Sequence, residues 1–168
     1  MLIQFLGVVS HYFLGMVSIA PLTWVGVFAV IFSGVIIGME RQILGKPAGM
    51  KTSVLITMST YLFVAISIYM GTDYLRVVGQ VVTGVGFLGG GVILSREGVI
   101  QGMTSASVIW ILSAIGVIIG LGYPLIGVKL AVLMVLVLYG LGFIERKTPF
   151  LQRGVHRLHR KINAKDDE

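Results

Sequence analysis

The chain has 168 residues, of which 56% are hydrophobic and only 12% are charged, and its mean hydropathy is +0.96. A soluble domain carries about 25% charged residues, so this composition excludes an ordinary soluble protein and indicates an integral membrane protein. The sequence contains no cysteine, which excludes disulfides, thiolate metal sites and cysteine nucleophiles.

The first 39 residues carry no charged side chain. A membrane-spanning helix needs about 20 apolar residues, so this run is long enough for two helices, and Pro21 is the natural break between them. The second helix, Leu22–Met39, is expected to span. The first, Leu2–Ala20, is expected to span with one polar face toward the bundle, and a helix lying flat in the membrane interface is the alternative. That face consists of Gln4, Gly7, His11, Gly15 and Ser18.

Four further apolar runs follow in chain order, separated by polar connections that read as loops or turns. The runs are Thr52–Met70, Val77–Ser95, Thr104–Leu121 and Leu125–Ile144. The connections are Glu40–Lys51, Gly71–Arg76, Arg96–Met103 and the turn Gly122-Tyr123-Pro124. The sequence thus predicts an all-α polytopic transmembrane bundle of five to six helices with Gly-rich packing faces. The bundle would form residues 1–144, and residues 145–168 would form a basic tail.

The positive charge is distributed unevenly along the chain, whose net charge is +6. The Glu40–Lys51 connection, the Arg96–Met103 connection and the tail hold 11 of the 13 Lys and Arg residues, and all three fall on one side. The positive-inside rule makes that side cytoplasmic, so the C-terminus is expected inside. We expect the tail to lie on anionic lipid rather than to bind nucleic acid.

Glycine accounts for 23 residues, and several glycines repeat on one helical face. Gly34-xxx-Gly38, Gly86-xxx-Gly90 and Gly116-xxx-Gly120 are typical of helices that approach closely in lipid, so we expect them to pack within the chain. Gly79 and Thr83 extend the second of these faces. The alternative is that Gly89-Gly90-Gly91 breaks the fourth helix and exposes carbonyl groups, as at ion sites.

Charged residues gather where the helices end. Glu40 and Arg41 close the second helix, while Lys51 and Thr52 open the third. We expect Glu40 to neutralise Arg41, Lys51 and Arg96 in one ion-pair cluster, because an acid held in the membrane needs partners. The alternative is an ordinary interfacial acid.

Two other basic residues lie on the opposite side. Arg76 shares a face of the fourth helix with Gln80 and Thr83, and Lys129 is expected to extend toward the membrane surface. No catalytic set, cofactor motif or metal site is predicted. His156 and His159 are three residues apart but have no further ligand nearby.

Two stretches resemble the MgtC/SapB family of bacterial inner-membrane proteins. The first runs from Gly38 to Arg41 and from Gly45 to Thr52. The second runs from Arg76 to Leu94 and continues through Gly102–Ser107 to Gly122. The resemblance implies a link to magnesium limitation and regulation of other membrane machinery, including the ATP synthase. In pathogens it implies survival inside macrophages. The positions that it marks are Glu40, Arg41, Gly49, Lys51, Thr52, Arg76, Gln80, Gly84, Gly86, Gly91 and Thr104.

The chain departs from the family pattern in three respects. Lys51 stands where the family usually has Arg, and lysine lacks the planar fork for bidentate pairing with an acid. Gly90 stands where the family usually has Ala, which should loosen the fourth helix. Virulence members carry a soluble C-terminal domain that this sequence does not include, so functions that rest on it are not expected here.

These features lead to two hypotheses from different classes. The first is a non-enzymatic regulator that contacts another membrane protein through its helices. The alternative is a small ion or solute transporter or channel, related to magnesium. An enzyme is not expected. The partners would be the lipid bilayer and a second membrane protein, and self-association into a homo-oligomer is compatible with the small-residue faces.

Overall fold

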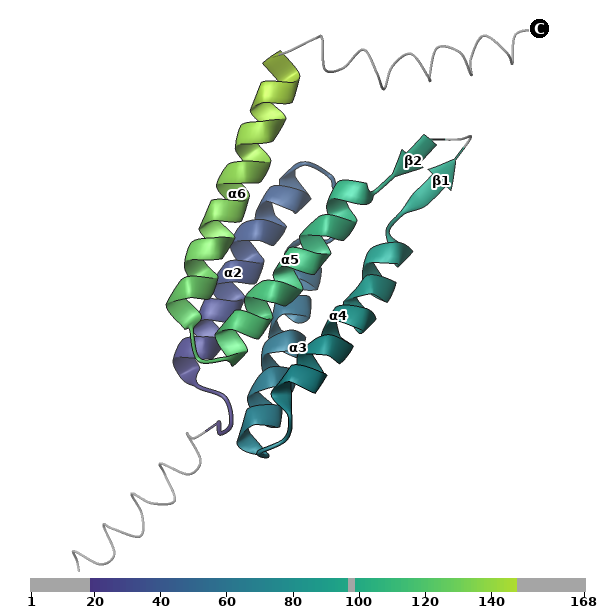
Figure 1. Cartoon of the computed structure of the whole chain (residues 1–168). Helices are drawn as coiled ribbons and strands as arrows, with labels where there is room; N and C mark the ends of the chain where they lie inside the picture. Colours follow the sequence, from purple (N-terminus) through teal and green to yellow (C-terminus); the bar gives the residue numbers. More distant parts are fainter. Residues whose placement is uncertain (1–18, 97–98, 148–168) are drawn as a thin grey trace, which may run out of the picture.

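The computed structural model describes residues 19–96 and 99–147. This part of the chain folds as an α-helical bundle with one short hairpin (Figure 1). The helices are α2 (Trp24–Ile43), α3 (Met50–Tyr69), α4 (Tyr74–Gly91), α5 (Met103–Gly120) and α6 (Pro124–Lys147), and the antiparallel strands are β1 (Leu94–Arg96) and β2 (Val99–Gln101). The predicted all-α bundle is confirmed. Almost all of the predicted first helix, and the tail from residue 148 onward with both of its histidines, lie outside the described residues.

Helices α2, α3, α5 and α6 form the body of the bundle, and α4 lies at its edge (Figure 1). Helix α2 packs on α3 and α6, and α5 packs on α3 and α6, whereas α4 packs mainly on α5. The core between these helices is apolar and includes fully buried Val30, Ile37, Val64 and Leu112. Helices α2, α3, α5 and α6 are long and apolar enough to cross a membrane.

Helix ends follow local capping signals. Thr23 caps α2, because its Oγ1 accepts a 3.0 Å hydrogen bond from the Gly26 amide. Asp73 caps α4, because its carboxylate accepts hydrogen bonds from the amides of Leu75 and Arg76. The predicted turn over residues 71–76 was therefore too long: Arg76 belongs to the first turn of α4.

The predicted fourth run to Ser95 was too long at its end, because α4 ends at Gly91 and β1 begins at Leu94. The hairpin thus covers the end of that run and most of the predicted loop, and in it Ser95 pairs with Ile100. The hairpin returns the chain to α5 through Gly102, which has a φ of +92° and caps that helix. A side chain at Gly102 would collide with the carbonyl oxygen of Val92. Only glycine fits this return without displacing the backbone.

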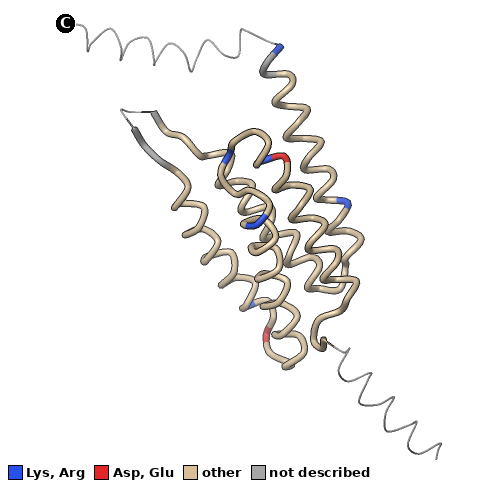
Figure 2. Tube along the Cα trace, turned by 180° about the vertical axis from the view of Figure 1, so that it is seen from behind, with Lys and Arg blue, Asp and Glu red and all other residues tan. Residues whose placement is uncertain are grey.

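The α2–α3 loop, the hairpin and the C-terminal end of α6 lie at the same end of the bundle (Figures 1 and 2). We call it the basic end, because the end of α2, the α2–α3 loop and the start of α3 contain Arg41, Lys46 and Lys51. The α3–α4 turn, which contains Asp73, and the first turn of α4, which contains Arg76, lie at the opposite end (Figure 1). Two of the three predicted basic connections thus lie at one end of the bundle, and most of the third, the tail, lies outside the described residues.

Glycines bring α3 into close contact with two neighbouring helices. A Cβ atom at Gly34 of α2 would lie 2.6 Å from the Cα of Val54. One at Gly116 of α5 would lie 2.6 Å from the carbonyl oxygen of Thr57. These distances are too short for a side chain, so both glycines are needed for the packing that the sequence predicts.

The glycines of α4 behave differently. The helix ends at Gly91, four residues before the end of the predicted fourth run, so the chain leaves the helix at these glycines. The carbonyls of Gly89 and Gly90 are not free, because they accept hydrogen bonds from the amides of Val92 and Ile93. Gly89 faces Trp110 of α5: a Cβ at Gly89 would lie 3.5 Å from Cδ1 of the Trp110 side chain. Gly86 and Gly90 meet no atom within 4 Å, so the expectation that this face packs within the chain is wrong for the described residues.

Candidate functional site

The marked positions gather mainly in two places, one at the basic end and one between α3 and α4. The first centres on Arg41, which is 3% exposed. Its Nη2 donates a 2.7 Å hydrogen bond to Oγ of Ser105 on α5. Its Nη1 lies 3.8 Å from Oε2 of Glu40.

This ion pair is incompletely satisfied. Counting side-chain atoms alone, Arg41 is 4% exposed and Glu40 is 9% exposed, so both side chains are largely buried. Oε2 of Glu40 and Nε of Arg41 are buried without a hydrogen-bond partner among the described residues. A buried ion pair is costly unless its remaining polar atoms are bonded, so this arrangement is typical of a functional position rather than of a stabilising one.

The predicted cluster, in which Glu40 pairs with Arg41, Lys51 and Arg96 together, does not form as predicted, because only the Glu40–Arg41 pair is present among the described residues. Lys51 is exposed and makes no ion pair with any described residue. The side chain of Arg96 lies outside what the structure describes. The partner that sequence reasoning missed is Ser105. The only signal for it was its position within the family-like stretch, in the first turn of α5, which begins at the basic end (Figure 1).

The loop before α3 is fixed by side chains on both sides. The Gln42 Oε1 accepts a 3.3 Å hydrogen bond from the Met50 amide, and the Ser53 hydroxyl donates to the Ala48 carbonyl at 2.9 Å. Gly49 caps α3, and a Cβ there would lie 3.1 Å from Gln42 Oε1. The close fit at Gly49 fixes α3 relative to the end of α2, where Glu40 and Arg41 lie.

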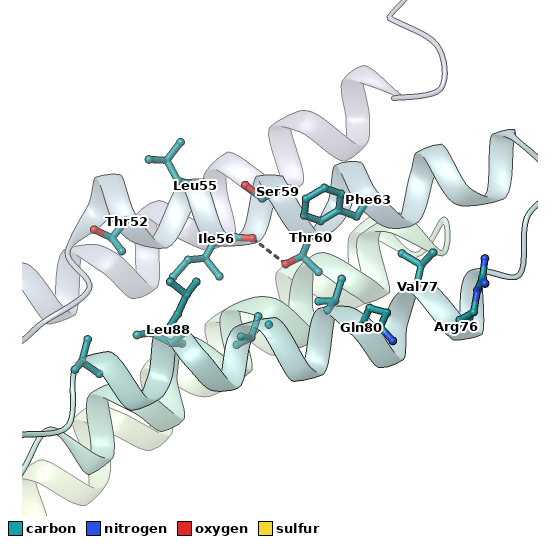
Figure 3. A pocket seen from close by; sticks show the side chains of 15 residues that line it. Thr52, Leu55, Ile56, Ser59, Thr60, Phe63, Arg76, Val77, Gln80 and Leu88 are labelled. Atoms are coloured by element: carbon teal, nitrogen blue, oxygen red, sulfur yellow. Dashed lines mark hydrogen bonds between the residues drawn. The ribbon is translucent and has the colours of Figure 1, made fainter.

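The second place is a groove between α3 and α4 with a volume of about 890 Å³ (Figure 3). Four marked positions line it: Thr52, Arg76, Gln80 and Gly84. The other lining residues are apolar except for Ser59 and Thr60. The apolar ones are Leu55, Ile56, Phe63, Val77, Val81, Val85, Leu88, Val92 and Ile109.

The polar groups of the groove are unevenly placed. Arg76 and Thr52 lie at its two ends (Figure 3). Thr60 donates its hydroxyl to the Ile56 carbonyl at 2.9 Å, so its donor is already used. The side chains of Arg76 and Gln80 are exposed and make no hydrogen bond or ion pair to any described residue. The only charged side chain in the described lining, Arg76, therefore lies with Gln80 at the end opposite to the basic end, whereas the polar lining nearer the basic end consists of the hydroxyls of Thr52 and Ser59 (Figure 3).

No acid lines the groove, and the described residues contain no group of three His, Asp or Glu side chains that could hold a metal ion. A path for a divalent cation would need oxygen ligands. The groove instead offers one guanidinium, which attracts an anion.

The remaining marked positions belong to neither place. Thr104, Lys51 and Gly91 are exposed near the basic end. Gly86 lies on a face of α4 that points away from the groove. We call it the outward face of α4, and it consists of Gly79, Thr83, Gly86 and Gly90. The Thr83 hydroxyl donates to the Gly79 carbonyl at 3.1 Å, so its donor is already used within the helix.

This fold, with four apolar helices long enough to span and a charged pair buried at one end, defines a polytopic α-helical membrane protein. The chain belongs to the MgtC family, whose family model matches residues 27–147. The family resemblance is thereby confirmed.

Curated relatives agree with this assignment. The chain is 46% identical over 112 residues to "Putative magnesium transporter YhiD" of Escherichia coli, covering 61% of this chain and 52% of the relative. It is 35% identical over 144 residues to a Haemophilus influenzae protein, covering 79% and 58%. It is 38% identical over 96 residues to Protein MgtC of Salmonella typhimurium, covering 56% and 41%. The chain thus spans about half the length of the curated relatives it matches. No solved structure shows significant similarity to it.

Proposed function

We propose that the chain is a non-enzymatic regulator that binds a transmembrane helix of another membrane protein on the outward face of α4. The observation that carries the proposal is the contrast between its glycines. Gly34 and Gly116 are covered by α3, whereas Gly86 and Gly90 meet no described atom within 4 Å.

Small residues matter in lipid, because helices there associate through close packing rather than through the hydrophobic effect. A face of Gly and Thr allows a second backbone to approach, and a threonine whose hydroxyl is already bonded adds no desolvation cost. The outward face of α4 meets both conditions along three turns of the helix.

The physiological context proposed is magnesium limitation or stress adaptation in the bacterial inner membrane. Its support is family membership and the names of two relatives, MgtC and YhiD. The basic end is proposed to face the cytoplasm, with the C-terminus inside, because basic connections are retained on that side.

The second candidate is an ion or solute transporter, and the observation in its favour is the unpartnered, buried Oε2 of Glu40. The acid-free groove argues against a magnesium path through it. A flux assay on purified protein in proteoliposomes separates the two functions. Saturable, ion-specific flux by the protein alone would contradict a purely regulatory role.

The docking surface is tested by a matched pair of substitutions. A Cβ at Gly86 or at Gly84 meets no atom within 4 Å, so Gly86→Leu and Gly84→Leu should both leave the chain's own packing intact. Only the first adds bulk to the outward face. We expect a cysteine at position 83 to cross-link to a membrane partner in cells. Gly86→Leu should abolish that cross-link, and Gly84→Leu should keep it. Loss in both variants, or in neither, would remove the outward face as the docking surface.

A further inference from the structure

The groove between α3 and α4 differs from the outward face in shape and in chemistry. Its walls carry large side chains, and Leu55, Phe63 and Leu88 are all exposed. The positions that line it on α4 run from Arg76 to Val92, a distance of ~24 Å along the helix axis. It is thus a long, mostly apolar groove with a cation at one end that has no ion pair among the described residues.

The groove measures about 890 Å³. That volume lies within the range of sites for small molecules, ~300–1,000 Å³, which are mostly apolar with a few placed polar groups. A flexible hydrocarbon chain can follow walls of this kind.

The charge at the end of the groove selects the head of such a molecule. Arg76 has no ion pair among the described residues, and Gln80 lies one turn further along the groove. The nearby Asp73 carboxylate accepts hydrogen bonds from the first amides of α4. A guanidinium binds phosphate oxygens through two parallel hydrogen bonds, and an amide can add a third.

We propose that the groove binds an anionic phospholipid, with its phosphate on Arg76 and Gln80 and an acyl chain lying between α3 and α4. One leaflet of the hydrocarbon core is ~15 Å thick, half of the ~30 Å total, so the groove is long enough for the chain of a lipid whose head lies at the opposite end. The site is separate from the outward face of α4, so either proposal can fail without the other.

Native mass spectrometry of the full chain in mild detergent tests the head. The probes are dioleoyl phosphatidylglycerol, which is anionic, and dioleoyl phosphatidylcholine, which is not. We expect the protein to retain the anionic lipid preferentially. Arg76→Gln should lower that retention about tenfold, equivalent to ~1.4 kcal/mol. Lys129→Gln is the control, because Lys129 is an exposed cation on α6. The basic tail is unchanged in both variants, so its own lipid binding cancels.

The acyl chain is tested by filling the groove. Gly84→Leu places four carbons where its Cβ meets no atom, and Gly86→Leu places the same side chain on the outward face. Only Gly84→Leu should lower retention of the anionic lipid. Unchanged retention in Arg76→Gln or in Gly84→Leu would overturn the proposal.

The other occupants have a separate test in whole membranes. Two variants are oxidised mildly in membranes. One carries cysteine at position 63, in the groove wall, and at position 7, and the other carries cysteine at position 63 alone. A disulfide within the chain would place its own N-terminal segment in the groove. A disulfide-linked dimer of the single variant would place a second copy there. Either disulfide would overturn lipid as the occupant, whereas the absence of both in membranes supports it.

Discussion

Arg41 and Ser105 are 64 residues apart in the chain, yet Nη2 of Arg41 donates a 2.7 Å hydrogen bond to Oγ of Ser105 in a buried site. The bond joins α2 to α5 at the basic end. It also holds the guanidinium where its other terminal nitrogen faces Glu40. The serine hydroxyl thereby positions the arginine of the buried ion pair.

Ser105→Ala should therefore destabilise the bundle. The substitution removes an acceptor from a buried charge, and hydrogen bonds to charged groups contribute about 1.5–3 kcal/mol. The measurement is the free energy of unfolding in detergent, followed by denaturant titration. Ser107→Ala is the matched control, because Ser107 is exposed and bonds only to the Met103 carbonyl of its own helix. Equal losses in the two variants would mean that the Arg41 bond contributes nothing.

Glu40→Gln should destabilise the chain by about 3 kcal/mol, the lower end for breaking a buried ion pair. An exposed pair would contribute only ~0–1 kcal/mol, so the size of the loss reports whether the pair is buried. A second change of Arg41 to Met should recover part of the loss, because it removes the cation left unpaired. Lys51→Met in the same background should recover nothing, since Lys51 is exposed and unpaired. Recovery by Lys51→Met would restore the larger cluster that the sequence suggests.

Alanine substitutions at glycines should separate packed helix faces from free ones. Gly34→Ala and Gly116→Ala each place a Cβ 2.6 Å from a backbone atom of α3, so each should cost about 1–3 kcal/mol. Gly86→Ala meets no atom and should instead raise stability by about 0.5–1 kcal/mol. Thermal unfolding in detergent measures all three. A loss at Gly86 comparable to that at Gly34 would show that this position is covered within the chain.

The orientation proposed for the bundle is tested by cysteine labelling, because the natural sequence has no cysteine. Lys46 lies in the α2–α3 loop and Asp73 precedes α4 at the opposite end. An impermeant thiol reagent added outside intact cells should label a cysteine at position 73 and miss one at position 46. Labelling at position 46 but not at position 73 would show that the basic end faces outside, and the proposed orientation would be wrong although the fold would stand.

The sequence predicts the helices well, because a chain in lipid must satisfy its backbone within each segment. The expected runs at Leu22–Met39 and Leu125–Ile144 correspond to α2 and α6, within four residues at each end. The start of α4 is missed by three residues, since the cap at Asp73 extends the helix beyond its apolar part.

What the sequence does not give is which faces meet. The pairs at Gly34 and Gly86 have the same spacing, yet only the first is covered, because covering depends on where α3 lies. In the same way, Glu40 and Arg41 are recognisable by type and position, whereas Ser105 is one hydroxyl among many in apolar helices. Its role follows from the start of α5 at the basic end, directly after the hairpin (Figure 1).

The composition of α4 has a consequence for biogenesis. Six glycines, Arg76 and Gln80 lie within its 18 residues, and it is not among the described helices apolar enough to span on their own. Its closest neighbour in the fold, α5, follows it in synthesis. We expect α4 to enter the membrane only once α5 has emerged from the ribosome. In a fusion that ends after residue 96, α4 should then fail to insert, and the reporter should stay on the side of Asp73 instead of reaching the basic end. In a fusion that ends after residue 122, which includes α5, α4 should be inserted. Among α2, α3, α4 and α5, the helix that carries the outward face would then be the last to insert stably into the bilayer.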